Sequence, residues 1–261
     1  MNVHLELLHG AENAFALLDD REPGERTTPE YAGIARAVVD TDGLLVLLPS
    51  STAAGNVRMR MFNPDGGEAE MCGNGVRCVA RYLEERSEGD RFVIDTLAGP
   101  IGARVVDTAP YEVETKMGIP IVGEESELEA AGRKWRYVSI SVGNPHVVIF
   151  VDDLDEVDLA TAGPAIETHS KFPLGTNVHF VKIAGRSKLQ VLHWERGAGA
   201  TRACGTGIVA CATAAVREGF VGPPVTVIAP GGTLRVAWLR DGEAMLTGPV
   251  EHTGARDLAV T

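Results

Sequence analysis

The chain has 261 residues, of which 44% are hydrophobic and 23% are charged, and its formal net charge is −12. This is the composition of a globular protein with one large domain or two of about 130 residues, and the acidic balance argues against nucleic-acid binding, which needs a basic face. We find no basic segment followed by an apolar one near the N-terminus, and no apolar run of the ~18 residues that span a bilayer. We therefore expect a cytoplasmic protein with no membrane partner.

The predicted elements of the first half begin with a helix. Thr28-Pro29 gives a cap and a proline at the first helical position, and the apolar pattern continues to Val38. A strand that ends at Phe62-Asn63 comes next, and then Cys72-Gly73-Asn74-Gly75 opens a small and apolar helix. Two strands joined by a glycine turn follow, over residues 92–95 and 101–105.

The second half repeats this order. A helix predicted over residues 157–166 is interrupted by Gly163-Pro164, a strand ends at Trp194-Glu195, and Cys204-Gly205-Thr206-Gly207 opens another apolar helix, 132 residues after Cys72. Strands over residues 225–228 and 233–237 flank a second glycine turn. A repeat at half-length fixes the architecture. It predicts an α+β fold with a domain over residues 1–120 and a similar one over 121–261, related by a pseudo-two-fold axis. We expect each to be a curved, mostly antiparallel sheet around its Cys-Gly-x-Gly helix, with the active site in the cleft between them.

The two Cys-Gly-x-Gly segments are typical of reactive thiols. A cysteine at a helix N-terminus lies beside unpaired backbone N–H groups and the positive end of the helix dipole, which favour a thiolate. The glycines let the backbone approach an anion such as a carboxylate. Two such segments, one from each half, predict an enzyme that inverts a stereocentre without a cofactor. Cys72 and Cys204 would remove a proton from one face of a carbon and add one to the other.

Other uses of the cysteines are open to consideration. A lone cysteine beside glycines is more often a buried small residue, and Cys78 and Cys211, further along the two helices, are interpreted as core residues. A four-cysteine metal site is disfavoured because no C-x-x-C pair exists. A redox pair of Cys72 with Cys204 is possible, and we interpret such a disulfide as an inactive form.

Polar residues at the ends of strands and turns add to the candidate site. Four asparagines occupy such places: Asn13, Asn63, Asn144 and Asn177. Of these, Asn13 and Asn144 stand at equivalent positions of the repeat. An asparagine of this kind is most often a turn former, and His146 could equally be a core histidine. Glu195-Arg196 precedes a glycine turn, where the carboxylate could bind an ammonium group and the guanidinium a carboxylate.

These segments resemble the diaminopimelate epimerase family. The resemblance rests on residues 60–78 (RMFNPDGGEAEMCGNGVRC), on Glu195-Arg196-Gly197-Ala198-Gly199, and on Ala203-Cys204-Gly205-Thr206-Gly207, with further matches over nearly the whole chain. It implies the interconversion of LL- and meso-diaminopimelate, an amino-acid substrate, no pyridoxal phosphate or other cofactor, no metal, and a homodimer.

The resemblance also implies a role for each matching residue. Cys72 and Cys204 would be the acid and base, and His146 and Glu195 would orient the reacting amino group and tune the thiols. The reacting carboxylate would bind Gly73, Asn74, Gly205 and Thr206. The rest of the substrate would bind Asn13, Asn63, Asn144, Asn177, Glu195 and Arg196.

The chain departs from the family pattern at its first turn. The family's usual His-Gly-x-Gly-Asn-Asp-Phe is replaced by His9-Gly10-Ala11-Glu12-Asn13-Ala14-Phe15. This change bears on the substrate rather than on the thiols. The alternatives are a related racemase that acts on histidine or a proline derivative, a related isomerase without the cysteine pair, a non-catalytic binding protein and a thiol redox protein.

Overall fold

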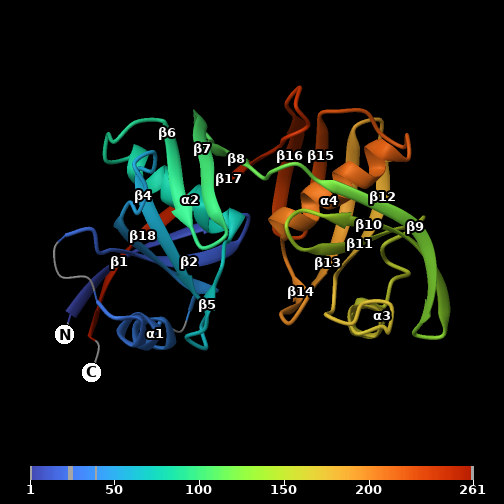
Figure 1. Cartoon of the computed structure of the whole chain (residues 1–261), viewed down its shortest axis with the longest axis horizontal. Helices are drawn as coiled ribbons and strands as arrows, with labels where there is room; N and C mark the ends of the chain where they lie inside the picture. The colour runs from blue at the N-terminus through green and yellow to red at the C-terminus, as the bar shows by residue number, and fades with distance from the viewer. Residues whose placement is uncertain (1, 23–25, 39, 260–261) are drawn as a thin grey trace. The chain divides into compact units, whose positions relative to one another are not determined.

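The computed structural model describes residues 2–22, 26–38 and 40–259, which form two compact units (Figure 1). Unit 1 consists of Met1–Lys116 together with Gly248–Thr261, and unit 2 is Met117–Thr247. The predicted division into 1–120 and 121–261 therefore needs a correction at the C-terminus. The last strand pairs with the first one, from Asn2 opposite Ala259 to His9 opposite Glu251, and so completes unit 1.

In its described residues, unit 1 is one mixed sheet with two helices. Its strands pair in the order β18-β1-β2-β3-β4-β6-β7-β8, and the short β5 pairs with the end of β4. The pairs β2–β3 and β4–β6 are parallel and the others are antiparallel. The elements are β1 (Asn2–Gly10), β2 (Asn13–Asp19), α1 (Thr28–Ala37), β3 (Gly43–Pro49), β4 (Val57–Phe62), β5 (Glu68–Ala69), α2 (Gly73–Glu84), β6 (Arg91–Thr96), β7 (Gly99–Thr108), β8 (Tyr111–Lys116) and β18 (Glu251–Ala259).

Unit 2 repeats this topology strand for strand. The order is β9-β10-β11-β12-β13-β15-β16-β17, with β14 beside β13 and with β11–β12 and β13–β15 as the parallel pairs. The strand β9 takes the place that β18 holds in unit 1. The elements are β9 (Ile121–Ala130), β10 (Arg133–Ser141), β11 (Pro145–Phe150), α3 (Leu159–Glu167), β12 (Asn177–Gly185), β13 (Lys188–Glu195), β14 (Gly199–Thr201), α4 (Gly205–Arg217), β15 (Val225–Ala229), β16 (Gly232–Trp238) and β17 (Ala244–Pro249).

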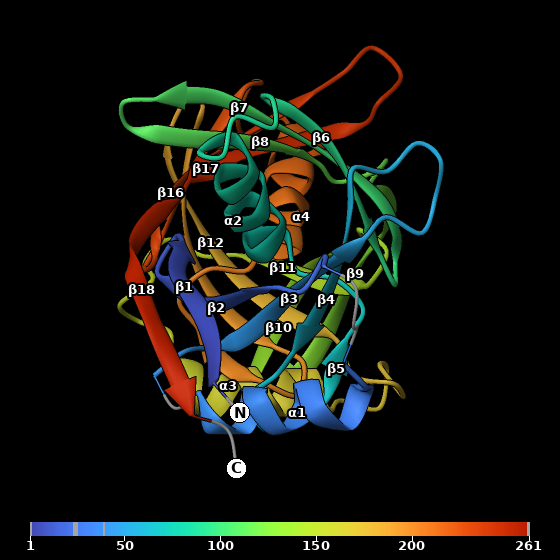
Figure 2. The same cartoon turned by 90° about the vertical axis from the view of Figure 1, so that its left-hand side faces the viewer.

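The sheet of unit 1 is covered by a helix on each face, which explains why β3 is apolar throughout. Alternate side chains of a strand point to opposite faces. Leu45 and Leu47 belong to the core around α2, whereas Leu44, Val46 and Leu48 belong to the core around α1. Figure 2 shows α2 wrapped by strands of its unit and α1 outside them. The predicted arrangement of strands around the Cys-Gly-x-Gly helix is confirmed, with α4 packed in the same way in unit 2.

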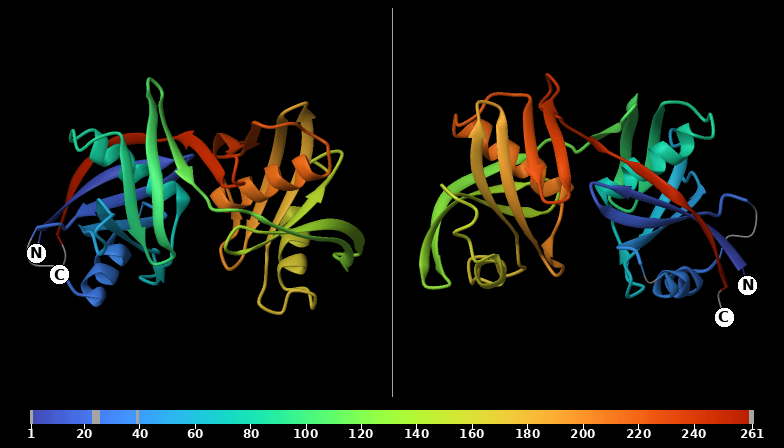
Figure 3. Two further views of the ribbon diagram at one scale, coloured as in Figure 1. Left: turned by 45° about the horizontal axis from the view of Figure 1, so that its top comes forward. Right: turned by 180° about the vertical axis from the view of Figure 1, so that it is seen from behind.

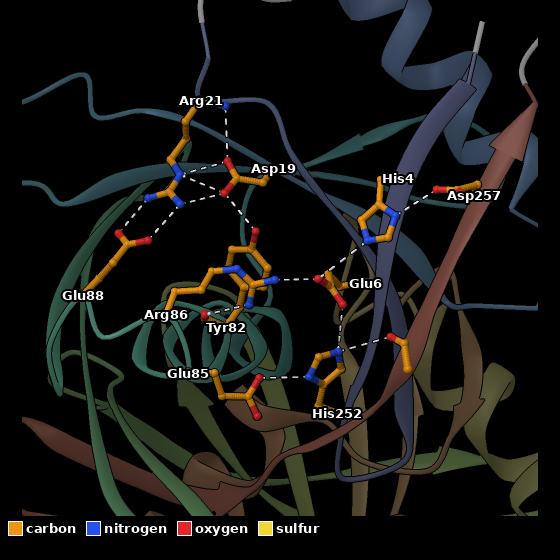
Figure 4. Close-up of polar contacts among 11 residues, drawn as sticks. His4, Glu6, Asp19, Arg21, Tyr82, Glu85, Arg86, Glu88, His252 and Asp257 are labelled. Carbon is orange, nitrogen blue, oxygen red and sulfur yellow. Dashed lines mark hydrogen bonds and ion pairs between the residues drawn. The ribbon is translucent and has the colours of Figure 1, made fainter.

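A polar network fastens the C-terminal strand to unit 1 (Figure 4). His252 on β18 lies between two carboxylates, with its Nε2 2.9 Å from Glu6 on β1 and its Nδ1 2.9 Å from Glu85 at the end of α2. Arg86 also donates to Glu6. These contacts tie the last strand to the first strand and to the helix that carries Cys72, and the two ends of the described chain lie side by side (Figure 3).

Two predicted helices differ in detail from the structure. The N-cap of α1 is Thr27 rather than Thr28, because the Glu30 carboxylate accepts a hydrogen bond from the Thr27 backbone in a capping box. The helix α3 continues through Gly163-Pro164 instead of breaking there. Glycine lacks the Cβ that usually clashes with a following proline, and it lets the helix approach Trp194, where a Cβ on residue 163 would lie 2.5 Å from the ring. Among the described residues, no helix is long and apolar enough to span a membrane.

Candidate active site

Cys72 is the N-cap of α2, as the sequence predicts, and its thiol is partly exposed. Its backbone is extended, and its carbonyl accepts the first helical bond, from Val76 at 2.9 Å. The N–H groups of Gly73, Asn74 and Gly75 precede that bond and have no partner within the helix. Gly75 also allows close packing, because a Cβ there would lie 2.8 Å from Leu45. This end of α2 therefore combines a thiol with an anion-binding helix terminus.

Three polar side chains of unit 1 form a series that reaches the Cys72 thiol. The Arg77 guanidinium donates to Asn74 Oδ1 at 2.6 Å, Asn74 Nδ2 donates to Asn13 Oδ1 at 3.2 Å, and the Cys72 thiol donates to the same oxygen at 3.8 Å. Arg77 is completely buried, and burial lowers its pKa while Cys78 and Cys72 raise it. The buried positive charge of Arg77 thus lies close enough to Cys72 to stabilise a thiolate there once the thiol has lost its proton.

Cys204 holds the equivalent position at the N-cap of α4, and it is only 4% exposed. Burial raises the pKa of this thiol well above its usual value, and the negative charge of Glu195, which accepts the thiol proton, raises it further. Hydrogen bonds from Thr206 and from the Gly207 backbone act in the opposite direction. The Thr206 hydroxyl lies 3.6 Å from the sulfur. Cys204 is thus held in the protonated form, and Glu195 contributes to this.

A buried series of histidines continues from this site into unit 2. His146 Nε2 is 2.8 Å from Asn144 Oδ1, and its Nδ1 is 2.8 Å from His179 Nε2. His179 Nδ1 is in turn 2.8 Å from His193 Nδ1. Burial lowers the pKa of His146 and of His193 to about 3, and it lowers that of His179 well below its usual value. All three imidazoles are therefore neutral at physiological pH.

Asn177 and Arg196 form a second cluster in unit 2. Asn177 is 5% exposed, and its amide is used internally: Nδ2 donates to the Pro145 carbonyl at 2.8 Å, and Oδ1 accepts from the Arg196 backbone at 3.0 Å. The exposed guanidinium of Arg196 donates to the Leu174 carbonyl at 3.2 Å. The structure thus gives Asn177 the task of fixing the backbone at Arg196, and its predicted contact with substrate stays a prediction.

Two further predicted residues lie at turns of unit 1. Asn63 directly follows β4, and its backbone forms a turn with Gly66 and Gly67. Asn13 follows a turn in which Ala11 and Glu12 have φ of 53° and 59°. Positive φ is costly for residues with a side chain, so the unusual Glu12 occupies a conformation that favours glycine. In unit 2, an apolar cavity of about 210 Å³ borders His146, but neither Cys204 nor Thr206 lines it.

The other two cysteines are core residues, as predicted. Cys78 and Cys211 are completely buried, and all four cysteines are thiols rather than disulfides. Burial raises the pKa of Cys78 to about 12 and also raises that of Cys211. Within the described parts of the chain, no group of three or more histidine, cysteine or acidic side chains is arranged to hold a metal ion.

Sequence reasoning missed Arg77, His179 and His193. Arg77 could have been found from helical periodicity, because it shares a face with the buried Asn74 and Ala80, where a charge is out of place. The two histidines stand between apolar residues on their strands, which is the ordinary pattern of a core histidine. Only the pairing of β12 with β13, which sets His179 opposite His193, reveals that they belong together.

Comparison with known proteins agrees with this geometry. The sequence model described as "Diaminopimelate epimerase" matches residues 7–122 and again residues 138–253, once in each repeat. The chain belongs to the diaminopimelate epimerase family. Among relatives of that name, the protein of Pelotomaculum thermopropionicum is 42% identical over 96% of both chains. That of Synechococcus elongatus is 40% identical over 99% of this chain and 100% of its own. The family description identifies the chain as an isomerase.

Solved structures confirm the fold of this family member. A phenazine biosynthesis protein from Enterococcus faecalis has a TM-score of 0.78 at 12% identity, over 99% of this chain and 100% of its own. A hydroxyproline epimerase from Agrobacterium vitis, solved with trans-4-hydroxy-L-proline, has a TM-score of 0.71 at 16% identity, over 98% and 91% of the two chains. At such identities the likeness concerns the fold alone.

Proposed function

We propose that this protein interconverts LL- and meso-diaminopimelate without a cofactor, with Cys72 and Cys204 as the acid and base. The observation that supports it most is the family match in both repeats, joined to a thiol at the N-terminus of a helix in each one. The duplicated helix-terminal thiol is what a two-sided proton transfer requires.

The surroundings of the two thiols differ, and this difference assigns their resting roles. Cys72 is partly exposed and in electrostatic contact with the buried Arg77. Cys204 is buried, and its proton is directed to Glu195. Cys72 therefore acts first as the base, which takes the α-proton, and Cys204 as the acid, which delivers a proton to the other face of the carbanion. The roles exchange in the reverse direction.

The helix termini stabilise the carbanion. The N–H groups of Gly73 and Asn74 in α2, and of Gly205 and Thr206 in α4, lack intrahelical partners and bind the carboxylate on the reacting carbon. Negative charge spreads onto that carboxylate as the α-proton leaves, so these donors bind the transition state more strongly than the substrate.

The distal end of the substrate carries a second carboxylate and ammonium group. Arg196 is exposed, and its Nη1 donates to a single carbonyl. Its guanidinium group can therefore still bind a carboxylate through two parallel hydrogen bonds. Asn177 holds the Arg196 backbone in place. His146, Asn144, Asn13, Asn63 and Glu195 complete the proposed set of groups that orient the substrate. A homodimer remains a prediction, which light scattering of the purified protein tests.

The test is conversion of LL-diaminopimelate to the meso isomer, followed by chiral chromatography, with histidine, proline and hydroxyproline as parallel substrates. Cys72→Ser and Cys204→Ser should each lower kcat by about 10²–10⁴, the usual contribution of a general acid or base. Cys211→Ala, which removes a buried thiol from the same helix as Cys204, is the matched control and should keep its activity. Turnover of only proline or histidine would move the protein to the alternative racemases.

A further inference from the structure

The three buried histidines of unit 2 form a series, and two of them, His179 and His193, have no task in the function proposed above. They start at His193 on β13, pass through His179 on β12 and reach His146 on β11, and each contact between two rings is 2.8 Å. From His146 the contacts continue to Asn144, then to Thr206 at 3.4 Å, and then to the sulfur of Cys204 at 3.6 Å. Six side chains thus form one series, from the buried imidazole of His193 to the thiol of Cys204.

The direction of this chain follows from the side-chain amide of Asn144. Its Nδ2 donates to Thr206 Oγ1, which leaves the hydroxyl proton of Thr206 to be donated to the sulfur of Cys204. The Oδ1 of Asn144 can only accept, so His146 Nε2 carries the proton of their contact. His146 Nδ1 accepts from His179 Nε2–H, and His179 Nδ1 accepts from His193 Nδ1–H.

The far end gives the same answer independently. In this direction the last atom, His193 Nε2, is a bare lone pair, and it has no hydrogen-bond partner among the described residues. In the opposite direction the same atom would be a buried N–H without an acceptor, which folded proteins avoid more strongly than an unused acceptor. The buried end also argues against a proton conduit, because His193 is completely buried.

We propose that His193 and His179 are positioning residues, which fix His146 and Asn144 in one hydrogen-bonded arrangement and so make the Thr206 hydroxyl donate to the sulfur of Cys204. A hydroxyl that donates to sulfur stabilises the thiolate that Cys204 becomes after it has given up its proton. In unit 1 a series also starts at a group that can only donate, Arg77, whose counterpart in α4 is the apolar Val209, but it ends at Asn13 Oδ1, which accepts from the Cys72 thiol.

This inference rests on the proposed role of Cys204, and it can be tested without substrate, so that its failure is distinct from a failure of the proposed function. The first measurement is the tautomer of each buried histidine, from ¹⁵N shifts of the ¹⁵N-histidine-labelled protein. We expect Nε2–H on His146 and His179 and Nδ1–H on His193, all neutral. Nδ1–H on His146 or Nε2–H on His193 would overturn the proposal.

The second measurement is the rate at which methyl methanethiosulfonate modifies Cys204 at a fixed pH, followed by peptide mass spectrometry. His193→Leu removes the first donor and should slow Cys204 roughly two- to fivefold, the effect of one net hydrogen bond, while Cys72 in the same sample keeps its rate. His193→Asn retains an N–H near the place of Nδ1 and should restore the rate. A variant that merely loosens the fold would make the buried Cys204 react faster.

An unchanged or faster Cys204 rate in His193→Leu would therefore contradict the proposal, as would a failure of His193→Asn to restore it. Should neither variant fold, the tautomers of the unmodified protein still decide.

Discussion

The helix α4 packs against the buried His179 at Gly207, and replacing this glycine is a sharp test of the packing. A Cβ on residue 207 would lie 2.4 Å from His179 Cε1, 2.8 Å from Nε2 and 3.0 Å from Nδ1. The ring cannot turn aside freely, because both of its nitrogens are in 2.8 Å contacts with other histidines. Gly207→Ala must therefore displace the ring or the first turn of α4.

The size of the effect follows from three contributions. Relief of the overlap needs a movement of about 1 Å to reach ordinary contact, and overpacking of a core typically costs about 1–3 kcal/mol. Loss of one of the two histidine contacts adds about 1 kcal/mol. The better helix propensity of alanine returns at most about 1 kcal/mol. We expect Gly207→Ala to lower the free energy of unfolding by about 1–3 kcal/mol.

The assay is urea unfolding of the variant beside a matched glycine. Gly33 in α1 is also helical, and a Cβ there would meet no atom within 4 Å. Gly33→Ala should raise the stability by about 0.5–1 kcal/mol, because it removes backbone freedom from the unfolded chain without strain. A Gly207→Ala variant that is as stable as Gly33→Ala would refute the reasoning.

Three further predictions concern buried polar groups. The pKa of His193 is lowered to about 3 in the folded protein, so the unfolded chain binds a proton there first as the pH falls below about 6.5. The free energy of unfolding should therefore decrease by about 1.4 kcal/mol per pH unit for this residue. Urea unfolding of His193→Asn between pH 7 and 5 should show a correspondingly shallower decrease. Arg77→Met removes a buried charge whose Nε and Nη1 have no hydrogen-bond partner among the described residues. The free energy of unfolding, from thermal denaturation, should therefore change by less than about 1 kcal/mol. The rate of thiol modification of Cys72 should fall relative to that of Cys204. Asp95 is 4% exposed and accepts hydrogen bonds from Ser50, Ser51 and Thr52, so Asp95→Asn should cost about 1–3 kcal/mol in urea unfolding, and an unchanged midpoint would contradict this.

The repeat was the part of the fold that sequence could predict best. Cys-Gly-x-Gly occurs twice, and strands of β-branched residues flank both helices, so the helices α2 and α4 and their neighbouring strands were expected where they are found. The position of β18 could not be predicted in this way. Its residues are mostly exposed and carry no apolar alternation, so only its pairing with β1 places it in unit 1.

The residues of the site also divide into those that the sequence could predict and those that it could not. Residues in glycine-rich motifs can be predicted because their backbone geometry depends on a few neighbouring residues. His179 and His193 are distant from those motifs in sequence, and they meet His146 only because β11, β12 and β13 pair in one register. A shift of one residue in that register would turn them to the other face of the sheet. Their contact is therefore a property of tertiary structure.

The central claim is that two thiols exchange protons with opposite faces of one carbon, and isotope transfer tests it most directly. LL-diaminopimelate is incubated with the protein in deuterium oxide, and both isomers are analysed at early times by mass spectrometry and NMR. The account predicts one deuterium at the inverted carbon of the meso product, with the recovered LL isomer still unlabelled. Meso product that retains the original hydrogen would contradict it.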